Sequence, residues 1–281
     1  MEVIHVAGTQ NHTGGMTMKK GLRFISLGLL LASVSVLLFA CGAGTKDSGS
    51  SKDGNGGKRV LKVGTDATYA PMEYMDEKGD IVGIDIDIVK AIAEAAGFEV
   101  EFKNYGWEPL FPALTGGEID FAVSSITITD ERKESYDFSD PYFVANQLIL
   151  VPEDSTVASF EDLKDKRVSV QINTTGHSVI QELLGKTSSK IVAPESMPLA
   201  ISEMINGNAD AAIGDNVVVT DYKENNPKVK VKTIEDDSFE EEYYGLMVKK
   251  GNTEITELLN EGLKIIKENG KLKEITEFAV E

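Results

Sequence analysis

Predicted strands and helices alternate along residues 60–150, and the same alternation begins again after Pro152. In the first block the apolar pattern predicts, in chain order, a strand at 60–65, a helix at 84–96, a strand at 99–104, a helix at 107–115, and strands at 119–123 and 147–151. A chain that alternates in this way builds a mainly parallel sheet with helices packed on it. The predicted fold class is therefore α/β.

The second block repeats the pattern with short strands. Its predicted elements are a short helix at 160–164 capped by Ser159, strands at 167–172, 191–193, 209–213 and 243–249, and helices at 174–184, 197–205, 217–224, 254–267 and 271–278. With 281 residues, of which 41% are hydrophobic, the chain can bury one large core or two medium ones. The residues alone thus indicate two α/β blocks.

A run of hydroxyl side chains follows the predicted strand at 119–123. The hydroxyls lie shortly before Arg132 and belong to Ser124, Ser125, Thr127 and Thr129. Ligands of α/β sheets bind at the carboxyl ends of the strands, where these residues would lie. An arginine there can bind a carboxylate at two points through its planar guanidinium. The alternative interpretation is a surface turn with a solvated arginine.

Residues suited to catalysis are scarce in this chain. His177 is the only histidine after residue 40 and Cys41 is the only cysteine, so neither a disulfide nor a His/Cys metal site is predicted, and a histidine-based triad would depend on His177 alone. The Gly-Lys-Thr at 185–187 resembles the end of a phosphate loop, but Ile180 stands where that motif needs another glycine. We therefore expect binding rather than turnover, with no cofactor and no metal.

The chain is strongly acidic, with a formal net charge of −18. This charge argues against nucleic acid and against an anionic membrane surface as partners. It favours the approach of cationic solutes, although solubility alone would also account for an acidic surface.

The amino-terminal region has the pattern of a secretory signal. The basic stretch 18–23 is followed by residues 24–40, which carry no charge, and then by Cys41. The tail Leu-Leu-Phe-Ala-Cys-Gly at 37–42 resembles a lipobox, in which the cysteine is lipidated and becomes the mature amino terminus, although Phe39 is unusual in that motif. An uncleaved membrane anchor is the alternative.

These patterns divide the amino-terminal region into three expected parts. Residues 1–17 fit no part of a signal, and we interpret them as upstream sequence from a mis-called start. Residues 18–40 are expected to be a lipoprotein signal peptide. Residues 41–58 are rich in glycine and serine and are expected to form a flexible tether.

Four stretches of the folded region resemble the polar amino-acid-binding receptors of bacterial ABC importers. They are GTDATYAP at 64–71, GIDID at 83–87, SSITITDER at 124–132 and DFSDPY at 137–142. The resemblance extends over most of residues 60–280 and is greatest to members that bind arginine, lysine or histidine.

The resemblance implies a two-lobed fold of the type II periplasmic-binding-protein kind. Each lobe would be a mainly parallel sheet flanked by helices, and the chain would cross between the lobes twice. The implied division is lobe 1 at 59–150 plus 244–281, lobe 2 at 151–243, and crossings near 149–152 and 242–248.

The resemblance also assigns roles to particular residues. Arg132 matches the arginine that binds the ligand carboxylate, and Asp215 matches the aspartate that takes the ammonium group. Tyr69 and Trp107 match the aromatic residues on either side of the ligand stem. Asp215 could instead cap the helix at 217–224, and Trp107 could be a core residue. The expected ligand-binding residues are Asp66, Tyr69, Glu73, Trp107, Ser124, Ser125, Thr127, Arg132, Gln171, Thr174, Thr175 and Asp215.

The ligand that we expect is a basic amino acid, arginine first and then lysine or histidine. Asp66 and Glu73 supply two carboxylates for a cationic head, Gln171 is a further acceptor, and Trp107 can make a cation–π contact. Glutamine is the alternative ligand, since the same aspartate could accept from its amide. The two carboxylates could also merely hold the loop. Where the family often has glycine, this chain has Asn173.

The sequence therefore predicts a receptor anchored by lipid on the extracytoplasmic face of the cell membrane. It would be a monomer that closes on a free amino acid and delivers it to the membrane subunits of an ABC permease. A lipoprotein receptor is typical of a Gram-positive envelope. A cyclohexadienyl dehydratase-like enzyme on the same fold is a less favoured alternative, because it would need a further acid or base in the cleft. A lytic or signalling module is another alternative, and a fused signalling module would need additional domains.

Replacing Cys41 with serine should abolish anchoring, because the lipoprotein pathway attaches its lipid to a cysteine thiol. We expect Cys41→Ser to leave the precursor uncleaved by the lipoprotein pathway or to release the protein into the medium. Membrane fractionation and the electrophoretic mobility of the product measure this result. A variant that is processed and membrane-bound like the parent would contradict the lipobox interpretation.

Overall fold

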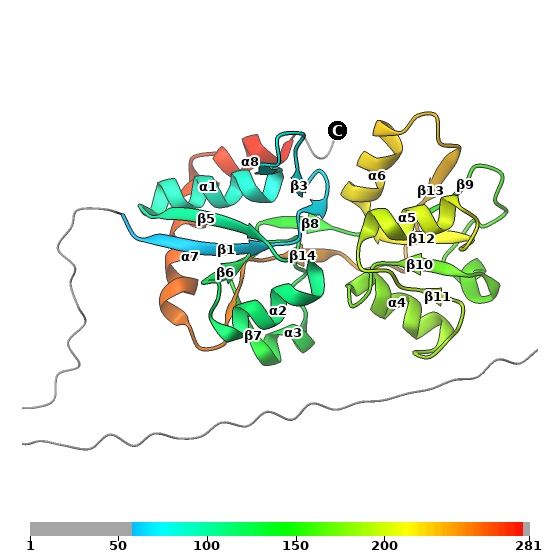
Figure 1. The fold of residues 1–281 in the computed structure, drawn as a ribbon, viewed down its shortest axis with the longest axis horizontal. Helices are drawn as coiled ribbons and strands as arrows, with labels where there is room; N and C mark the ends of the chain where they lie inside the picture. The colour runs from blue at the N-terminus through cyan, green and yellow to red at the C-terminus, as the bar shows by residue number, and fades with distance from the viewer. Residues whose placement is uncertain (1–57, 278–281) are drawn as a thin grey trace, which may run out of the picture. The chain divides into compact units, whose positions relative to one another are not determined.

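The computed structural model describes residues 58–277, which form two sheets with helices packed against them (Figure 1). The expectations for Cys41 and for residues 1–17, 18–40 and 41–57 lie outside the described residues. Within the described part, no helix has both the length and the apolar character needed to cross a bilayer. The α/β class and the two-lobed arrangement predicted from the sequence are confirmed. The expectation of mainly parallel sheets was wrong, because each five-stranded sheet is mixed, with two parallel and two antiparallel strand pairs.

The first sheet has five strands in the order β5-β1-β6-β15-β7. The central strand β1 runs parallel to β5 and β6, whereas β15 runs antiparallel to β6 and β7. The strands are β1 (Val60–Thr65), β5 (Glu99–Asn104), β6 (Phe121–Ala122), β7 (Tyr136–Phe138) and β15 (Met247–Lys249). The carboxyl-terminal strand thus returns to complete the lobe that the amino-terminal strand begins.

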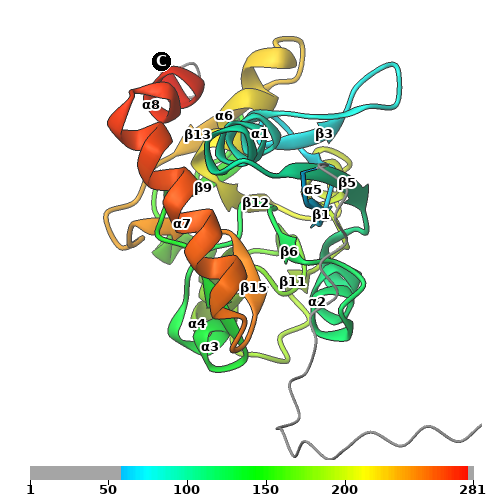
Figure 2. The same cartoon turned by 90° about the vertical axis from the view of Figure 1, so that its left-hand side faces the viewer.

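Helices cover this sheet, and α1 (Ile84–Ala96) packs closely on α7 (Thr253–Glu268). Figure 2 shows α7 and α8 near α1. The helices of this lobe are α1 (Ile84–Ala96), α2 (Trp107–Gly116), α3 (Asp130–Ser135), α7 (Thr253–Glu268) and α8 (Lys271–Thr276). Gly262 permits the contact, because a Cβ there would lie 2.6 Å from the carbonyl oxygen of Ile92 in α1.

The second sheet has five strands in the order β11-β10-β12-β9-β13. Strand β10 runs parallel to β11 and β12, and β9 runs antiparallel to β12 and β13. The elements of this lobe are β9 (Gln147–Pro152), the 3₁₀ helix η1 (Glu161–Asp165), β10 (Val168–Val170), α4 (Thr175–Leu184), β11 (Ile191–Val192), α5 (Met197–Ile205), β12 (Ala211–Asp215), α6 (Asn216–Asn225) and β13 (Val231–Ile234).

A two-stranded antiparallel ribbon connects the lobes (Figure 1). Its strands are β8 (Phe143–Ala145) and β14 (Glu242–Tyr244). The first crossing therefore lies earlier than the expected 149–152, because all of β9 pairs within the second sheet. The strand expected at 243–249 is divided into β14 and β15.

Several short elements were not predicted. A small three-stranded sheet follows β1 and consists of β2 (Thr68–Tyr69), β3 (Glu73–Met75) and β4 (Ile81–Val82). Elements of two or three residues carry too little apolar periodicity to be recognised. The predicted Ser159 cap was also wrong, since the backbone amides of Ala158 and Ser159 instead donate to Asp162 at 2.9 and 3.0 Å.

Candidate functional site

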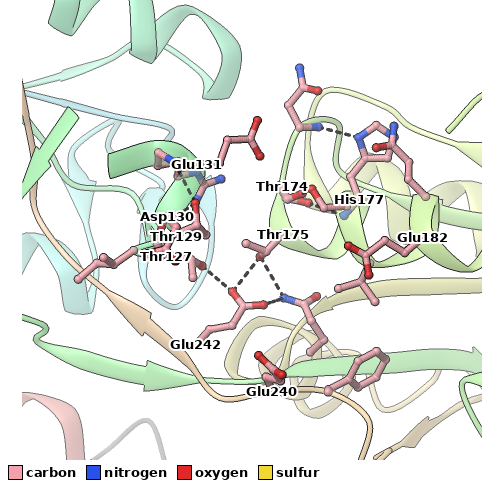
Figure 3. A pocket seen from close by; sticks show the side chains of 18 of the residues that line it. Thr127, Thr129, Asp130, Glu131, Thr174, Thr175, His177, Glu182, Glu240 and Glu242 are labelled. Carbon is pink, nitrogen blue, oxygen red and sulfur yellow. Dashed lines mark hydrogen bonds between the residues drawn. The ribbon is translucent and has the colours of Figure 1, made fainter. Parts of the chain in front are cut away.

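The expected ligand-binding residues lie around one pocket, which encloses a cavity of about 20 Å³. They reach it from the carboxyl ends of strands in both sheets, where ligands of α/β folds bind. A wider cleft of about 1340 Å³ shares part of this lining (Figure 3). The residues that line the pocket are Asp66, Tyr69, Glu73, Trp107, Ser124, Ser125, Thr127, Arg132, Gln171, Thr174, Thr175 and Asp215.

Arg132 is held at one end of the pocket by its own helix. It lies in the first turn of α3, where the side chain of Thr129 accepts from its backbone amide at 3.1 Å. Its Nη1 donates to the carbonyl oxygen of Thr127 at 2.8 Å, and its guanidinium lies 5.4 Å from the ring centre of Trp107. Burial lowers the pKa of Arg132, while the charges of Glu242 and Asp215 oppose that shift. The remaining N–H groups are available to an anion.

Glu242 in the connecting ribbon bonds to both lobes, as Figure 3 shows. Its carboxylate accepts from the hydroxyls of Thr127 at 2.5 Å and Thr175 at 2.8 Å, and from the amide of Gln147 at 2.8 Å. Sequence reasoning missed Glu242 and Gln147. The only available signal for Glu242 was its place in an expected crossing segment, because a run of three glutamates resembles a solvated surface.

Asp215 ends strand β12 and is buried beside the same network. Its carboxylate accepts from Gln147 Nε2 at 2.6 Å and from the hydroxyl of Tyr244. Asp215 occupies the N-cap position of α6, as the capping alternative expected, but its side chain makes no cap hydrogen bond. Burial, together with the charge of Glu242, raises the pKa of Asp215 to about 7.

Two further acidic residues, Asp66 and Glu73, line the pocket. Asp66 accepts from the hydroxyl of Thr68 at 3.0 Å and from Gln171 Nε2 at 3.1 Å, and the second bond joins the two lobes. Glu73 accepts from the hydroxyls of Ser124 at 3.0 Å and Ser125 at 3.3 Å. Burial raises the pKa of both carboxyls.

The two expected aromatic residues also line the pocket. Trp107 begins α2 and meets Phe111 edge to face, with ring centres 5.0 Å apart. Trp107 and Tyr69 are 7% and 9% exposed, so each belongs to the core and to the pocket wall at once. The interpretation of Trp107 as a core residue and its interpretation as a ligand contact are therefore compatible.

Residues 61–278 match the family described as bacterial extracellular solute-binding proteins, family 3. The chain belongs to this family. It is 40% identical over 246 residues to the probable histidine-binding protein of Neisseria gonorrhoeae, covering 87% of this chain and 91% of that protein.

Solved structures agree with this membership. The arginine-, lysine-, histidine-binding protein ArtJ of Geobacillus stearothermophilus is 46% identical to this chain, with a TM-score of 0.76. The match covers 79% of this chain and 95% of the ArtJ chain. An ancestral arginine-binding protein bound to glutamine is 39% identical, with a TM-score of 0.73 and coverages of 79% and 97%.

Replacing Asp215 with asparagine should make stability less sensitive to pH. Because folding raises the pKa of this acid from 3.8 to about 7, the parent loses free energy of unfolding as the pH rises through that window. Asp215→Asn should therefore melt above the parent at pH 8, by roughly 2–4 °C for each kcal/mol recovered, and the difference should shrink towards pH 4.

Thermal unfolding monitored by circular dichroism between pH 4 and 8 measures this effect. The exposed Asp154→Asn is the matched control and should follow the parent. A difference between Asp215→Asn and the parent that stays constant across the pH range would contradict the assignment.

Proposed function

We propose that this protein is an extracytoplasmic receptor for a basic L-amino acid, arginine first and then lysine or histidine, which it delivers to an ABC permease. One observation carries the proposal: a single pocket is lined by the guanidinium of Arg132 and by the buried carboxyls of Asp66, Glu73 and Asp215. The names of the relatives, histidine-binding and arginine-, lysine-, histidine-binding, support it.

The α-carboxylate of the ligand binds Arg132. The free N–H groups of the guanidinium offer two parallel hydrogen bonds, and cation–π contact with Trp107 fixes the plane of the group. The hydroxyls of Thr127 and Thr175, which donate to Glu242, line the pocket beside it from the two lobes. The amino terminus of α4, capped by Thr174, places further backbone amides nearby.

The α-ammonium of the ligand binds Asp215. This carboxyl is 7% exposed and, among the described residues, receives hydrogen bonds from the neutral donors Gln147, Tyr244 and Tyr69. A cation beside it removes the cost of burying its charge and lowers its pKa. The ammonium group thus supplies the positive charge that Asp215 lacks in the protein alone.

The cationic side chain of the ligand lies between Asp66 and Glu73. Its aliphatic stem passes the rings of Tyr69 and Trp107, which both line the pocket. The side chain carbonyl of Gln171 is a further acceptor for guanidinium or ammonium hydrogens. Charge decides the preference, because a cation compensates the two buried carboxyls, whereas a neutral amide requires the carboxyls to keep a proton.

We propose that the lobes close on the ligand about the ribbon of β8 and β14. The cavity has room for little more than one water molecule, so an amino acid enters only when the lobes separate. Bonds across the cleft hold the closed form: Gln171 to Asp66 at 3.1 Å and Asn173 to Glu108 at 2.7 Å. Lobe 1 is proposed to consist of residues 59–146 and 242–277, and lobe 2 of residues 147–241.

Two alternatives are weaker. A glutamine receptor shares the carboxylate and ammonium sites, and an ancestral arginine-binding protein 39% identical to this chain has been solved with glutamine. A dehydratase would need a general acid or base over the ligand, and the only histidine among the described residues, His177, lies in the outer cleft. The relatives are named for binding, not for turnover.

We propose further that the receptor is a monomer attached to the membrane through a lipid on Cys41. The lipobox-like stretch at 37–42 supports this, and residues 41–58 are the proposed tether to the folded part. Attachment beside the permease raises the local concentration of loaded receptor at its partner.

Replacing Arg132 with alanine should abolish ligand binding while leaving the fold intact. The variant leaves a ligand carboxylate buried without its partner, which costs about 3–5 kcal/mol, or two to four decades in affinity. Isothermal titration with arginine measures the loss. The exposed Arg167→Ala is the control and should titrate like the parent. Unchanged affinity in Arg132→Ala would remove Arg132 from the proposed site.

Arginine should bind far more tightly than glutamine to the parent protein. Calorimetry with arginine, lysine, histidine and glutamine side by side tests this order at one pH and one salt concentration. An uncompensated buried charge costs several kcal/mol, so we expect a preference of at least about tenfold. Tight glutamine binding without detectable arginine binding would refute the basic ligand and leave an amino-acid receptor.

A further inference from the structure

Asp85 is a fully buried carboxyl directly behind the pocket, and it does not line the pocket itself. It lies in the first turn of α1 and accepts from the backbone amide of Ser125 at 2.7 Å and from the hydroxyl of Tyr142 at 2.8 Å. Within residues 58–277 no lysine or arginine forms an ion pair with it. Its charge is therefore supported only by neutral donors.

Ser125 joins Asp85 to Glu73, the carboxyl proposed to meet the cationic side chain of the ligand. Ser125 has a left-handed backbone, with φ of 48°, and its amide donates to Asp85 while its hydroxyl donates to Glu73. Both carboxyls are completely buried. Burial first, and then the charge and hydrogen bond of Asp85, raise the pKa of Glu73, and burial raises the pKa of Asp85 to about 6.

The groups that face this pair are acidic or neutral. Asp66 follows β1, Tyr69 lies in β2 and Tyr142 precedes β8. The charge of Glu195, which precedes α5, helps to raise the pKa of Asp66. No cation contributes to the shift of either carboxyl. Two adjacent buried carboxyls without a cation cannot both be ionised at low cost, so they retain a proton between them.

We propose that Asp85 is a specificity-determining positioning residue: it keeps one proton on the Glu73–Asp85 pair, which a cationic ligand side chain displaces and a neutral amide does not. The O–H bond of the acid breaks, the proton passes to solvent, and the ligand cation compensates the new carboxylate. This inference rests on the proposed function of the same pocket.

The exchange keeps the pocket close to neutral with either kind of ligand. A guanidinium or ammonium meets the ionised pair, and the amide of glutamine meets the protonated pair, whose acid hydrogen can bond to the amide oxygen. Glutamine bound to an ancestral arginine-binding protein, 39% identical to this chain, fits this behaviour. Specificity between arginine and glutamine then depends on pH.

The test measures how many protons the protein releases on ligand binding, by calorimetry in buffers of different ionisation enthalpy. Asp215, with its pKa raised to about 7, also loses a proton when an ammonium binds, but arginine and glutamine share that group. The difference between the two ligands therefore reports the carboxyls that meet the ligand side chain, which are the Glu73–Asp85 pair and Asp66, and the Asp85→Asn variant separates the pair from Asp66. Histidine is unsuitable because its own imidazole titrates in the same range.

We expect the parent to release about one proton more with arginine than with glutamine near neutral pH. The ratio of arginine to glutamine affinity should rise by up to about tenfold per pH unit from about pH 5 upward, until the free pair is ionised. In Asp85→Asn, Glu73 loses the charge of its partner acid but keeps its burial and the weaker charge of Asp66, so its proton is held less tightly and the extra release near neutral pH should decrease. Asp87→Asn, exposed two residues further along α1, should behave like the parent.

A second variant serves if Asp85→Asn does not fold. Tyr142→Phe removes a hydrogen bond that favours ionised Asp85, so the pair holds its proton more tightly and the pH dependence should move to higher pH. Equal proton release for arginine and glutamine in the parent would overturn the inference alone. Failure of arginine, lysine and histidine to bind at all would overturn the proposed function with it.

Discussion

Buried carboxyls without a matching protein cation are the constraint on which this site depends. Asp66, Glu73 and Asp215 line the pocket, and Arg132 is the only basic residue among its lining side chains. Burial raises the pKa of all three acids, so the protein alone either protonates them or bears the cost of their charge. A ligand with two cationic groups and one carboxylate supplies the positive charge that these acids lack in the free protein. The same imbalance that costs stability in the free protein thus selects the ligand.

The topology brings these groups together from distant parts of the chain. Asp66 follows β1 and Asp215 ends β12, so the acids of the pocket come from different sheets. The return of β15 to the first sheet makes the chain cross twice, and the second crossing places Glu242 between Thr127 of one lobe and Thr175 of the other. A single crossing would leave the ribbon without its second strand and the cleft without this carboxylate.

The sequence predicted the regular elements well where periodicity was strong. The bounds of β1, α1, β5 and α5 agree with the structure, because each has several apolar residues at its own spacing and Gly97, with φ of 81°, ends α1. Half of the pocket lining was predicted because it falls in the contiguous motifs at 64–71 and 124–132, and the other half came from the wider resemblance to the family. Asp85 and Gln147 were missed because an acid in a first helical turn and a polar residue at a strand start both have ordinary local explanations. Their roles arise from contacts 40 to 95 residues away, which no local pattern records.

Gln147 shows how the ligand charge can be linked to the connection between the lobes. Its Nε2 carries two hydrogens, yet it lies within hydrogen-bonding distance of Asp215, Glu242 and Thr175, at 2.6, 2.8 and 3.4 Å. When an ammonium group takes over the charge of Asp215, the amide no longer has to serve that carboxylate and can bond fully to Glu242. Glu242 in turn accepts from hydroxyls of both lobes. The carboxyl that meets the ligand ammonium and the carboxylate that joins the two lobes therefore share one hydrogen-bond donor.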